Sequence, residues 1–260
     1  MFKKLSIIFF IFLFSTPSFG STIGERFHSE TRHTWTQIMK DIFISKPPMA
    51  EQFKEYKGHK INLPKPEYKG MTFEDALLKR RSIREYSTKP LTLSELSQLL
   101  FSAQGITGRI YGTYLRTAPS AGGLYPFEIY IVANNINGLK KGIYHYSVKD
   151  HSMVLIKEGD FRKEIMRSSL DQEMMRDAGV VFVLSAVFDR TRSKYGERGF
   201  RYVYMEAGHI SQNIYLQATS LGLGSVVVGA FIDDSVNELI GLDGKKEAAI
   251  ALHAVGSIKK

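Results

Sequence analysis

The sequence has no cysteine, and this absence excludes disulfide bonds, thiolate metal sites and cysteine nucleophiles. Long apolar runs are scarce: the run Leu5–Phe14 has ten residues, about half of what a membrane-spanning helix needs. The 260-residue chain is 43% hydrophobic and 23% charged, an ordinary globular composition. A chain without disulfides must be stabilised by its hydrophobic core.

The first twenty residues have the organisation of a secretory signal peptide. Lys3 and Lys4 precede the apolar run Leu5–Phe14, and two small residues, Ser18 and Gly20, stand two apart after it. We therefore predict cleavage near Gly20 and a periplasmic or secreted mature protein. After cleavage we expect no stable membrane insertion.

Positive charge exceeds negative charge, with 35 lysines and arginines against 26 aspartates and glutamates and a formal net charge of +9. Such an excess can favour binding to nucleic acids or anionic membranes. Here the basic residues are spread along the chain, and no nucleic-acid-binding motif is present. We predict a basic exported protein with no nucleic-acid partner.

Proline placement and hydrophobic periodicity divide the chain into three parts. These are a signal peptide at 1–20, an N-terminal extension at 21–70 and a domain at 71–260. The extension contains a helical pattern near Thr34–Phe43, and prolines interrupt the residues that follow it. We find no internal repeats.

The third part starts with two helices that carry their own capping residues. Thr72 is followed three residues later by Asp75, Thr92 is followed by Glu95, and Gly105 ends the second helix. The predicted strands are Phe127–Ala133, Ile143–Val148, Met153–Lys157, Gly179–Phe188, Ser225–Gly229 and Ala248–Val255, and the further helices are Tyr202–Ser220 and Ser235–Ile240. This order of elements predicts an α+β fold with helices around a mixed β-sheet.

The stretch KRRSIREYS, residues 79–87, gathers cations around a serine directly after the first helix. Arg80, Ser82 and Arg84 would grip a phosphate, because guanidinium groups offer planar forks of donors to its oxygens. A helix C-terminus repels anions, so the side chains themselves would have to hold the phosphate. The alternative is a solvated basic stretch at a helix end.

Two further stretches are rich in glycine. APSAGGLYPFEIY, residues 118–130, leads into a strand, and its small residues would let backbone amides approach a flat ligand; an ordinary loop is an equal alternative. Ser120 is not in a G-x-S-x-G motif, which argues against a hydrolase nucleophile. GLGSVVVGAF, residues 222–231, lacks the dinucleotide-binding pattern and by itself is structural.

The stretch EAGHISQN, residues 206–213, places Glu206 and His209 three apart on a helix, the spacing of a di-iron ligand pair. A second such pair and two further glutamates are not visible, so a metal site is disfavoured. Glu206, His209, Asn213 and Gln217 are instead predicted to line one polar stripe that faces an interface or a cofactor.

The stretch RSKYGERGFRY, residues 192–202, places Lys194 next to Tyr195 before a glycine-flanked turn. A lysine beside a tyrosine favours loss of the phenolic proton, so such a pair can move protons. The alternative is a basic loop without a catalytic role.

Taken in this order, the five stretches resemble the nitroreductase superfamily of flavin enzymes, and within it the SagB-type branch of thiazole/oxazole dehydrogenases. The resemblance covers about Met71–Gly256. The five stretches together are specific evidence for the family, although each stretch alone is weak evidence. It implies a nitroreductase-like FMN-binding domain at 71–260 and a domain-swapped homodimer with the flavin at the interface.

The resemblance also assigns site residues. Those assigned to FMN are Arg80, Arg81, Ser82, Arg84, Pro119, Ser120, Ala121, Gly122, Gly123, Leu124, Gln172, Gly229 and Ala230. The residues from Pro119 to Leu124 would reach the flavin from the other subunit. Lys194 and Tyr195 match the pair that this branch uses for proton removal. Two features depart from the wider family. Many members carry an asparagine where Gly123 stands, although the SagB-type pattern has small residues there. Many members also end in basic residues that help to bind the phosphate, whereas the sequence here stops at Lys259 and Lys260, which is expected to be too soon to reach it.

The predicted function is that of an FMN-dependent oxidoreductase that passes hydride between a donor and an acceptor, with a small-molecule or peptide substrate. One alternative is a nitro- or quinone-reducing enzyme fed by NAD(P)H. Another is a flavin-binding protein without turnover, and a third is a basic anion-binding protein without flavin. The azoline-forming branch normally works beside cyclodehydratase partners in the cytoplasm. The predicted export signal breaks that link and argues against oxidation of peptide heterocycles here.

Overall fold

The computed structural model describes residues 21–259, except for the side chains of residues 37 and 40–42. The chain divides into two compact units, of which the second begins at Phe43, and each is described by itself. The predicted signal peptide, residues 1–20, lies outside the described residues. Among the described helices, none combines the length and the apolar character that crossing a bilayer requires.

The first unit holds α1 (Ile23–Glu30) and most of α2 (Trp35–Phe43). Helix α1 starts with a capping box: Thr22 Oγ1 accepts from Glu25 N at 3.2 Å, and Glu25 Oε2 accepts from Thr22 N at 2.7 Å. Helix α2 confirms the helix predicted near Thr34–Phe43.

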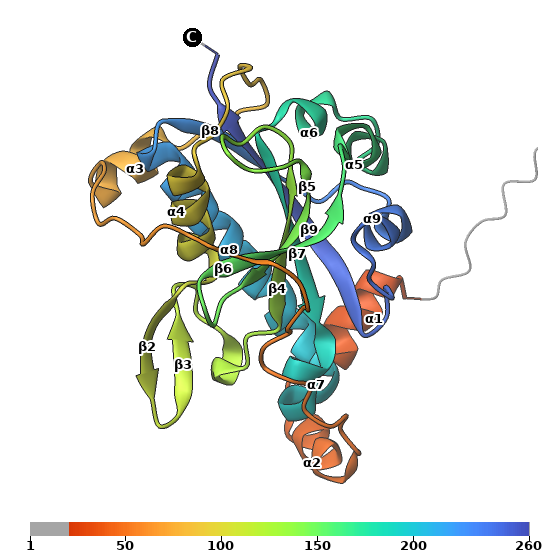
Figure 1. Cartoon of the computed structure of the whole chain (residues 1–260). Coiled ribbons are helices and arrows are strands. Elements are labelled where there is room, and N and C mark those ends of the chain that lie inside the picture. The colour runs from red at the N-terminus through yellow and green to blue at the C-terminus, as the bar shows by residue number, and fades with distance from the viewer. Residues whose placement is uncertain (1–20, 260) are drawn as a thin grey trace, which may run out of the picture. The chain divides into compact units, whose positions relative to one another are not determined.

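The second unit is built on a seven-stranded sheet with the order β1-β6-β5-β4-β7-β9-β8 (Figure 1). The ladders between these strands are antiparallel, and a parallel bridge joins Ser82 to Ser225 at the β8 edge. The strands are β1 (Lys60–Asn62), β4 (Phe127–Ala133), β5 (Gly142–Ser147), β6 (Ser152–Glu158), β7 (Val180–Val187), β8 (Leu223–Val228) and β9 (Glu247–Ser257). The predicted strands correspond to β4 to β9, and the predicted α+β class is confirmed.

Strands β4 and β7 lie inside the sheet and are covered on both faces. In β4, Ile129 and Ile131 belong to one hydrophobic cluster, whereas Tyr130 and Val132 belong to another on the opposite face. A strand covered on both faces has apolar residues at nearly every position. The nearly continuous apolar run at residues 179–188 predicted β7 for this reason.

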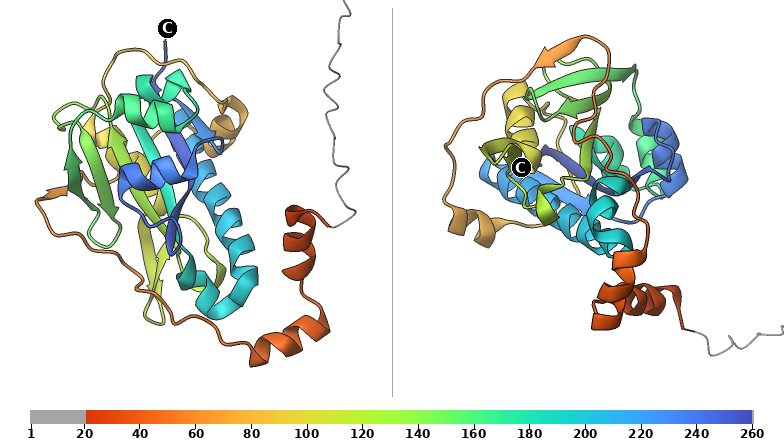
Figure 2. Two further views of the ribbon diagram at one scale, coloured as in Figure 1. Left: turned by 90° about the vertical axis from the view of Figure 1, so that its right-hand side faces the viewer. Right: turned by 90° about the horizontal axis from the view of Figure 1, so that it is seen from below.

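Helices cover both faces, which gives three layers (Figure 1). Helices α4 and α8 pack on one face and α5, α6 and α9 on the other; Figure 2 shows α8 running along the sheet. The helices are α3 (Phe73–Lys79), α4 (Leu93–Gln104), α5 (Arg162–Ser168), α6 (Glu173–Asp177), α7 (Phe188–Tyr195), α8 (Gly199–Ser220) and α9 (Asp233–Ile240). Both predicted caps are present: Thr72 accepts from Asp75 N at 3.2 Å and Thr92 from Glu95 N at 3.1 Å.

The sequence patterns predict neither helix α7 nor the hairpin of β2 (Ile106–Ile110) and β3 (Thr113–Arg116). The hairpin turns at Tyr111 and Gly112, both with left-handed backbones of φ 47° and 84°. Glycine and asparagine favour such turns and tyrosine does not, so the turn signal is weak. Helix α7 has the sequence FDRTRSKY, which carries no apolar periodicity.

Residues 43–63, called the strap below, pass around the β1 edge of the sheet. Tyr56 packs with the cluster on the α9 side, and Leu63 belongs to the cluster on the α8 side. Between Tyr56 and Leu63, strand β1 pairs with β6. Before Tyr56, Lys54 Nζ forms an ion pair with Glu247 Oε2 at 2.6 Å. These contacts attach the strap to the second unit, which begins at Phe43; the predicted domain at 71–260 stays a prediction.

Candidate active site

The arginine-rich stretch leaves α3 and runs extended beside β8. Ile83 N donates to a β8 carbonyl at 2.9 Å, and a Cβ on Gly224 would lie 2.8 Å from Ile83 Cγ2, so only glycine fits there. Alternate residues of an extended chain share one side, which groups Arg80, Ser82 and Arg84 opposite Ile83. The alternation of an extended chain therefore predicts that these three side chains lie on one side of the stretch after α3.

Tyr215 of α8 joins this stretch to β8. Its hydroxyl lies 2.9 Å from Ser82 Oγ and accepts from Val227 N at 2.9 Å. The guanidinium of Arg80 lies 5.0 Å from the centroid of the same ring. The sequence analysis missed Tyr215, because a tyrosine on a helix with an apolar face is most simply read as core; its hydroxyl, which needs a partner when buried, is the available signal.

Two neighbouring cations have other contacts. Arg81 Nη1 donates to the carbonyls of Leu78 and Arg80 at 3.1 and 2.7 Å, where α3 ends. Its assignment to FMN therefore stays a prediction. Lys259 Nζ lies 3.8 Å from Glu85 Oε2, which places the basic end of the chain beside the arginine-rich stretch.

Gln172 ties the start of α6 to the backbone that follows β8. Its Nε2 donates to Ala230 O at 2.9 Å and to Ser169 O at 2.8 Å. The two residues before it, Leu170 and Asp171, both have left-handed backbones, with φ of 57° and 56°. Strain of this kind in residues other than glycine concentrates at functional sites. We call the following residues the first cluster: Arg80, Ser82, Arg84, Gln172, Tyr215, Gly229 and Ala230.

The loop 119–124 and the predicted proton-moving pair form a second cluster. Gly122 has a left-handed backbone with φ 64°, and a Cβ there would lie 2.8 Å from Tyr195 Oη and 3.0 Å from Lys194 Nζ. The left-handed backbone favours glycine here, and a side chain at this position would displace the ends of Lys194 and Tyr195. Lys194 Nζ lies 5.4 Å from the centroid of the Tyr195 ring. The structure thus unites two stretches that lie about seventy residues apart in the sequence.

Glu206 and His209 fix this loop on α8. Glu206 is 2% exposed; it accepts from the Ser120 hydroxyl, and its Oε1 lies 3.5 Å from Gln104 Nε2. Ser120 Oγ in turn accepts from Tyr125 N at 2.8 Å. His209 Nδ1 lies 3.4 Å from the carbonyl of residue 119. Burial raises the pKa of Glu206 to about 7, against the opposing effects of Ser120 and a nearby arginine.

The four polar residues predicted to form one stripe on α8 separate in the structure. Glu206 is buried and His209 is exposed, whereas Asn213 and Gln217 line a different hollow of about 580 Å³ beside α3 and α4. Helical residues three and four apart share a face only approximately, and this helix is buried on more than one side. Among residues 21–259, no group of three histidine, aspartate or glutamate side chains is arranged to hold a metal ion.

We expect Glu206→Gln to change the pH dependence of stability. The folded protein holds this proton at pH values where the unfolded chain, with a pKa near 4.5, has lost it. Stability is therefore lost as pH rises from about 4.5 to about 7, and glutamine removes that loss. The free energy of unfolding of the variant, relative to that of the wild type, should therefore rise by about 3 kcal/mol between pH 4 and pH 8. Urea unfolding of the flavin-free protein measures the gain, with exposed Glu164→Gln as control; a pH-independent difference would contradict it.

A model of the "Nitroreductase family" matches residues 77–257. The chain belongs to the nitroreductase family. The protein MJ1384 of Methanocaldococcus jannaschii, whose name places it among the nitroreductases, is 43% identical over 199 residues, covering 76% of this chain and 98% of that protein. The microcin B17-processing protein McbC of Escherichia coli is 27% identical over 153 residues, covering 56% of each.

Solved structures support the same assignment. A crystal structure of a nitroreductase-type protein from Anabaena variabilis has a TM-score of 0.74 and 28% identity, covering 91% of this chain and 46% of that one. The chain thus spans about half the length of this structure and of the microcin-processing protein. The predicted likeness to the nitroreductase family and its SagB-type branch is confirmed.

Within this nitroreductase-family domain, the two clusters lie on different parts of α8. The first contacts the helix at Tyr215 and the second at Glu206, nine residues earlier. At 1.5 Å per residue, the two contact points are about 13 Å apart along the helix axis. The two clusters therefore contact α8 about two and a half turns apart.

Proposed function

We propose that this protein is an FMN-dependent oxidoreductase resembling the SagB-type dehydrogenases and working as a homodimer. The observation that carries the proposal is the separation of the site into two clusters, each with part of the machinery that the family resemblance implies. Bound FMN would supply the group that accepts or donates hydride. The residues of the chain would bind it, position the substrate and move the proton.

The first cluster fits FMN in charge and in shape. Arg80, Ser82 and Arg84 are gathered on one side of an extended stretch, a donor set suited to a phosphate. At the other end of the cluster, a Cβ on Gly229 would meet no atom within 4 Å, so packing within the chain does not demand this glycine. A flat ring lying against this backbone, beside Gln172, would explain why residue 229 is a glycine.

A homodimer would complete the site. Helices α3 and α8 pack together and expose large apolar side chains, among them Phe73, Leu78 and Met205. Gly208, in the same exposed part of α8, has no atom within 4 Å of where a Cβ would stand, which leaves room for a second helix to approach. Exposed apolar patches mark protein–protein contacts, and a twofold pairing makes two equal sites. Each site would take the arginines of one chain and the Gly122 loop of the other.

The second cluster supplies acid–base chemistry. A substrate that loses hydride from carbon must also lose a proton, and the Tyr195 hydroxyl is the group placed to take it. Lys194 provides a cation beside this ring, with its Nζ 5.4 Å from the ring centroid. A small molecule or a peptide would be the substrate; the Escherichia coli relative processes microcin B17. If the signal peptide predicted at 1–20 directs export, the reaction would take place in the periplasm or outside the cell.

We expect the purified protein to be yellow, or to become yellow with added FMN. An absorption spectrum across roughly 350–500 nm, recorded after gel filtration removes free flavin, shows the bound cofactor. Light scattering on the same sample should give the mass of two chains. A protein that stays colourless after incubation with FMN contradicts the proposed function and favours an anion-binding protein without flavin.

The family name of its relatives favours a second candidate, a nitro- or quinone-reducing enzyme fed by NAD(P)H. The two readings differ in their reductant. Rapid bleaching of the bound flavin by NADH or NADPH would support the reductase. Bleaching by dithionite alone, with no organic donor effective, would support a flavin-binding protein without turnover.

A further inference from the structure

The strap contacts α7 at the end that carries the proton-moving pair. Lys46 Nζ donates to Lys194 O at 3.0 Å, across 148 residues of sequence. The last carbonyls of a helix have no partner within the helix, and a cation there also complements the helix dipole. Lys46 therefore closes the C-terminal end of α7, directly before Tyr195.

The strap also holds the first turn of α7, through Arg190. This side chain is 2% exposed, and its Nε donates to Glu51 O of the strap. Its Nη2 donates to Glu128 Oε1 at 2.6 Å, and its Nη1 donates to Tyr125 O at 3.3 Å. Tyr125 follows the loop 119–124 directly, so one guanidinium joins the strap, α7 and the exit of that loop.

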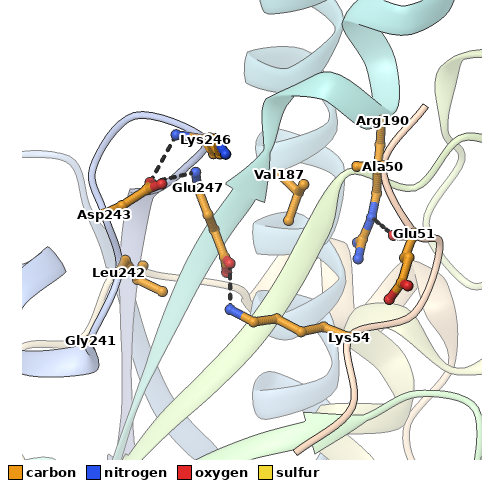
Figure 3. A pocket seen from close by; sticks show the side chains of 10 residues that line it. All are labelled: Ala50, Glu51, Lys54, Val187, Arg190, Gly241, Leu242, Asp243, Lys246 and Glu247. Atoms are coloured by element: carbon orange, nitrogen blue, oxygen red, sulfur yellow. Dashed lines mark hydrogen bonds and ion pairs between the residues drawn. The ribbon is translucent and has the colours of Figure 1, made fainter. Parts of the chain in front are cut away.

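The strap itself is fastened to the sheet. Lys54 Nζ lies 2.6 Å from Glu247 Oε2 and donates to Tyr130 Oη at 2.8 Å, and Ser185 Oγ donates to Glu247 Oε1 at 2.7 Å. Figure 3 shows the Lys54–Glu247 and Arg190–Glu51 contacts on two sides of a hollow of about 430 Å³. The charges are partly buried and paired, which gives the strap a defined position.

Helix α7 needs such support. It has eight residues, and its N-cap, Val187, makes no side-chain capping bond. An isolated helix of this length is unstable in water. The strap lies outside residues 77–257, the part of the chain that the family model describes.

We propose that the strap positions the Lys194–Tyr195 pair, with Lys46 holding the end of α7 and Glu51, through Arg190, holding its start. This inference rests on the proposed function, because the pair matters for catalysis only if it acts on the substrate. Lys46 is a positioning residue; it does not reach the reacting atoms. Its loss loosens the last turn of α7 and lets the Tyr195 hydroxyl move away from Gly122.

The first test uses hydrogen exchange in the full chain without FMN. Lys46→Met should speed amide exchange in residues 192–198 by about three- to tenfold, the equivalent of one hydrogen bond. Lys46→Arg should restore the wild-type rate. The matched control is Lys60→Met, which removes the Lys60–Asp150 ion pair from the same strap without touching α7. Exchange in residues 127–133 should be unchanged in all variants. Wild-type exchange in Lys46→Met, or equal acceleration in residues 127–133, would overturn the inference.

The second test is kinetic. In the wild-type background, Lys46→Met should slow substrate-driven flavin reduction by about three- to tenfold, the factor expected for hydrogen exchange. In the Tyr195→Phe background it should have no further effect, because both changes act through the Tyr195 hydroxyl. An undiminished effect in the Tyr195→Phe background would overturn the positioning role. If Tyr195→Phe alone changes nothing, the proposed function fails at that residue, and hydrogen exchange still decides whether the strap orders α7.

Discussion

Replacing Tyr195 by phenylalanine is expected to lower the rate of substrate-driven flavin reduction by about 10²–10⁴-fold, the usual contribution of a positioned general base. The change deletes one oxygen, which lies close enough to Gly122 that a Cβ at that glycine would be 2.8 Å from it. The rest of the ring stays to pack against Tyr202, with 4.9 Å between ring centroids. Stopped-flow absorbance of the flavin measures the rate once a donor is found.

The flavin content should be unchanged in this variant, because the proposed phosphate site is in the first cluster and Tyr195 is in the second. Lys194→Ala should cause a similar loss, and the double variant should be no worse than either single one if the two residues act as a unit. Tyr202→Phe is the matched control: its hydroxyl accepts from Arg198 Nε at 2.8 Å. Reduction of Tyr195→Phe at the wild-type rate would remove the pair from the mechanism and favour the simple reductase.

Arg80→Ala and Arg84→Ala are each expected to lower the affinity for FMN by roughly ten- to a hundredfold, and the affinity for riboflavin by much less. A charge-assisted hydrogen bond contributes about 1.5–3 kcal/mol, and only FMN carries the phosphate that would receive it. Quenching of flavin fluorescence during titration gives both dissociation constants. Lys79→Ala is the control, a neighbouring cation whose Nζ is 3.5 Å from Asp75 of its own helix. Equal losses for the two flavins would assign these arginines to the fold.

Local signals predicted the framework of this fold well. Threonines followed by acidic residues fixed the starts of α3 and α4, since capping needs only residues that are close in sequence. The apolar run 179–188 predicted the buried strand β7 for the same kind of reason. Such patterns depend on local geometry and burial, which one stretch of sequence records.

The parts that were missed depend on contacts between distant residues. Nothing near Lys46 in the sequence indicates that its partner is the carbonyl of Lys194. Tyr215 reads as a core residue until Ser82 is placed beside its hydroxyl. The five stretches indicated the nitroreductase family correctly, but their division into two clusters depends on positions along α8 that only the folded chain sets.

The position of β9 in the sheet bears on how the chain reaches its folded state. β9 is the last strand along the described chain, yet it lies between β7 and β8 and pairs with both. The contact between Lys54 and Glu247 likewise joins residues 193 apart. Contacts at such separations form slowly, because a long loop must close before they contribute. During synthesis β8 therefore cannot join the rest of the sheet until residues 247–257 have been made, because β9 is the strand that connects it to β7.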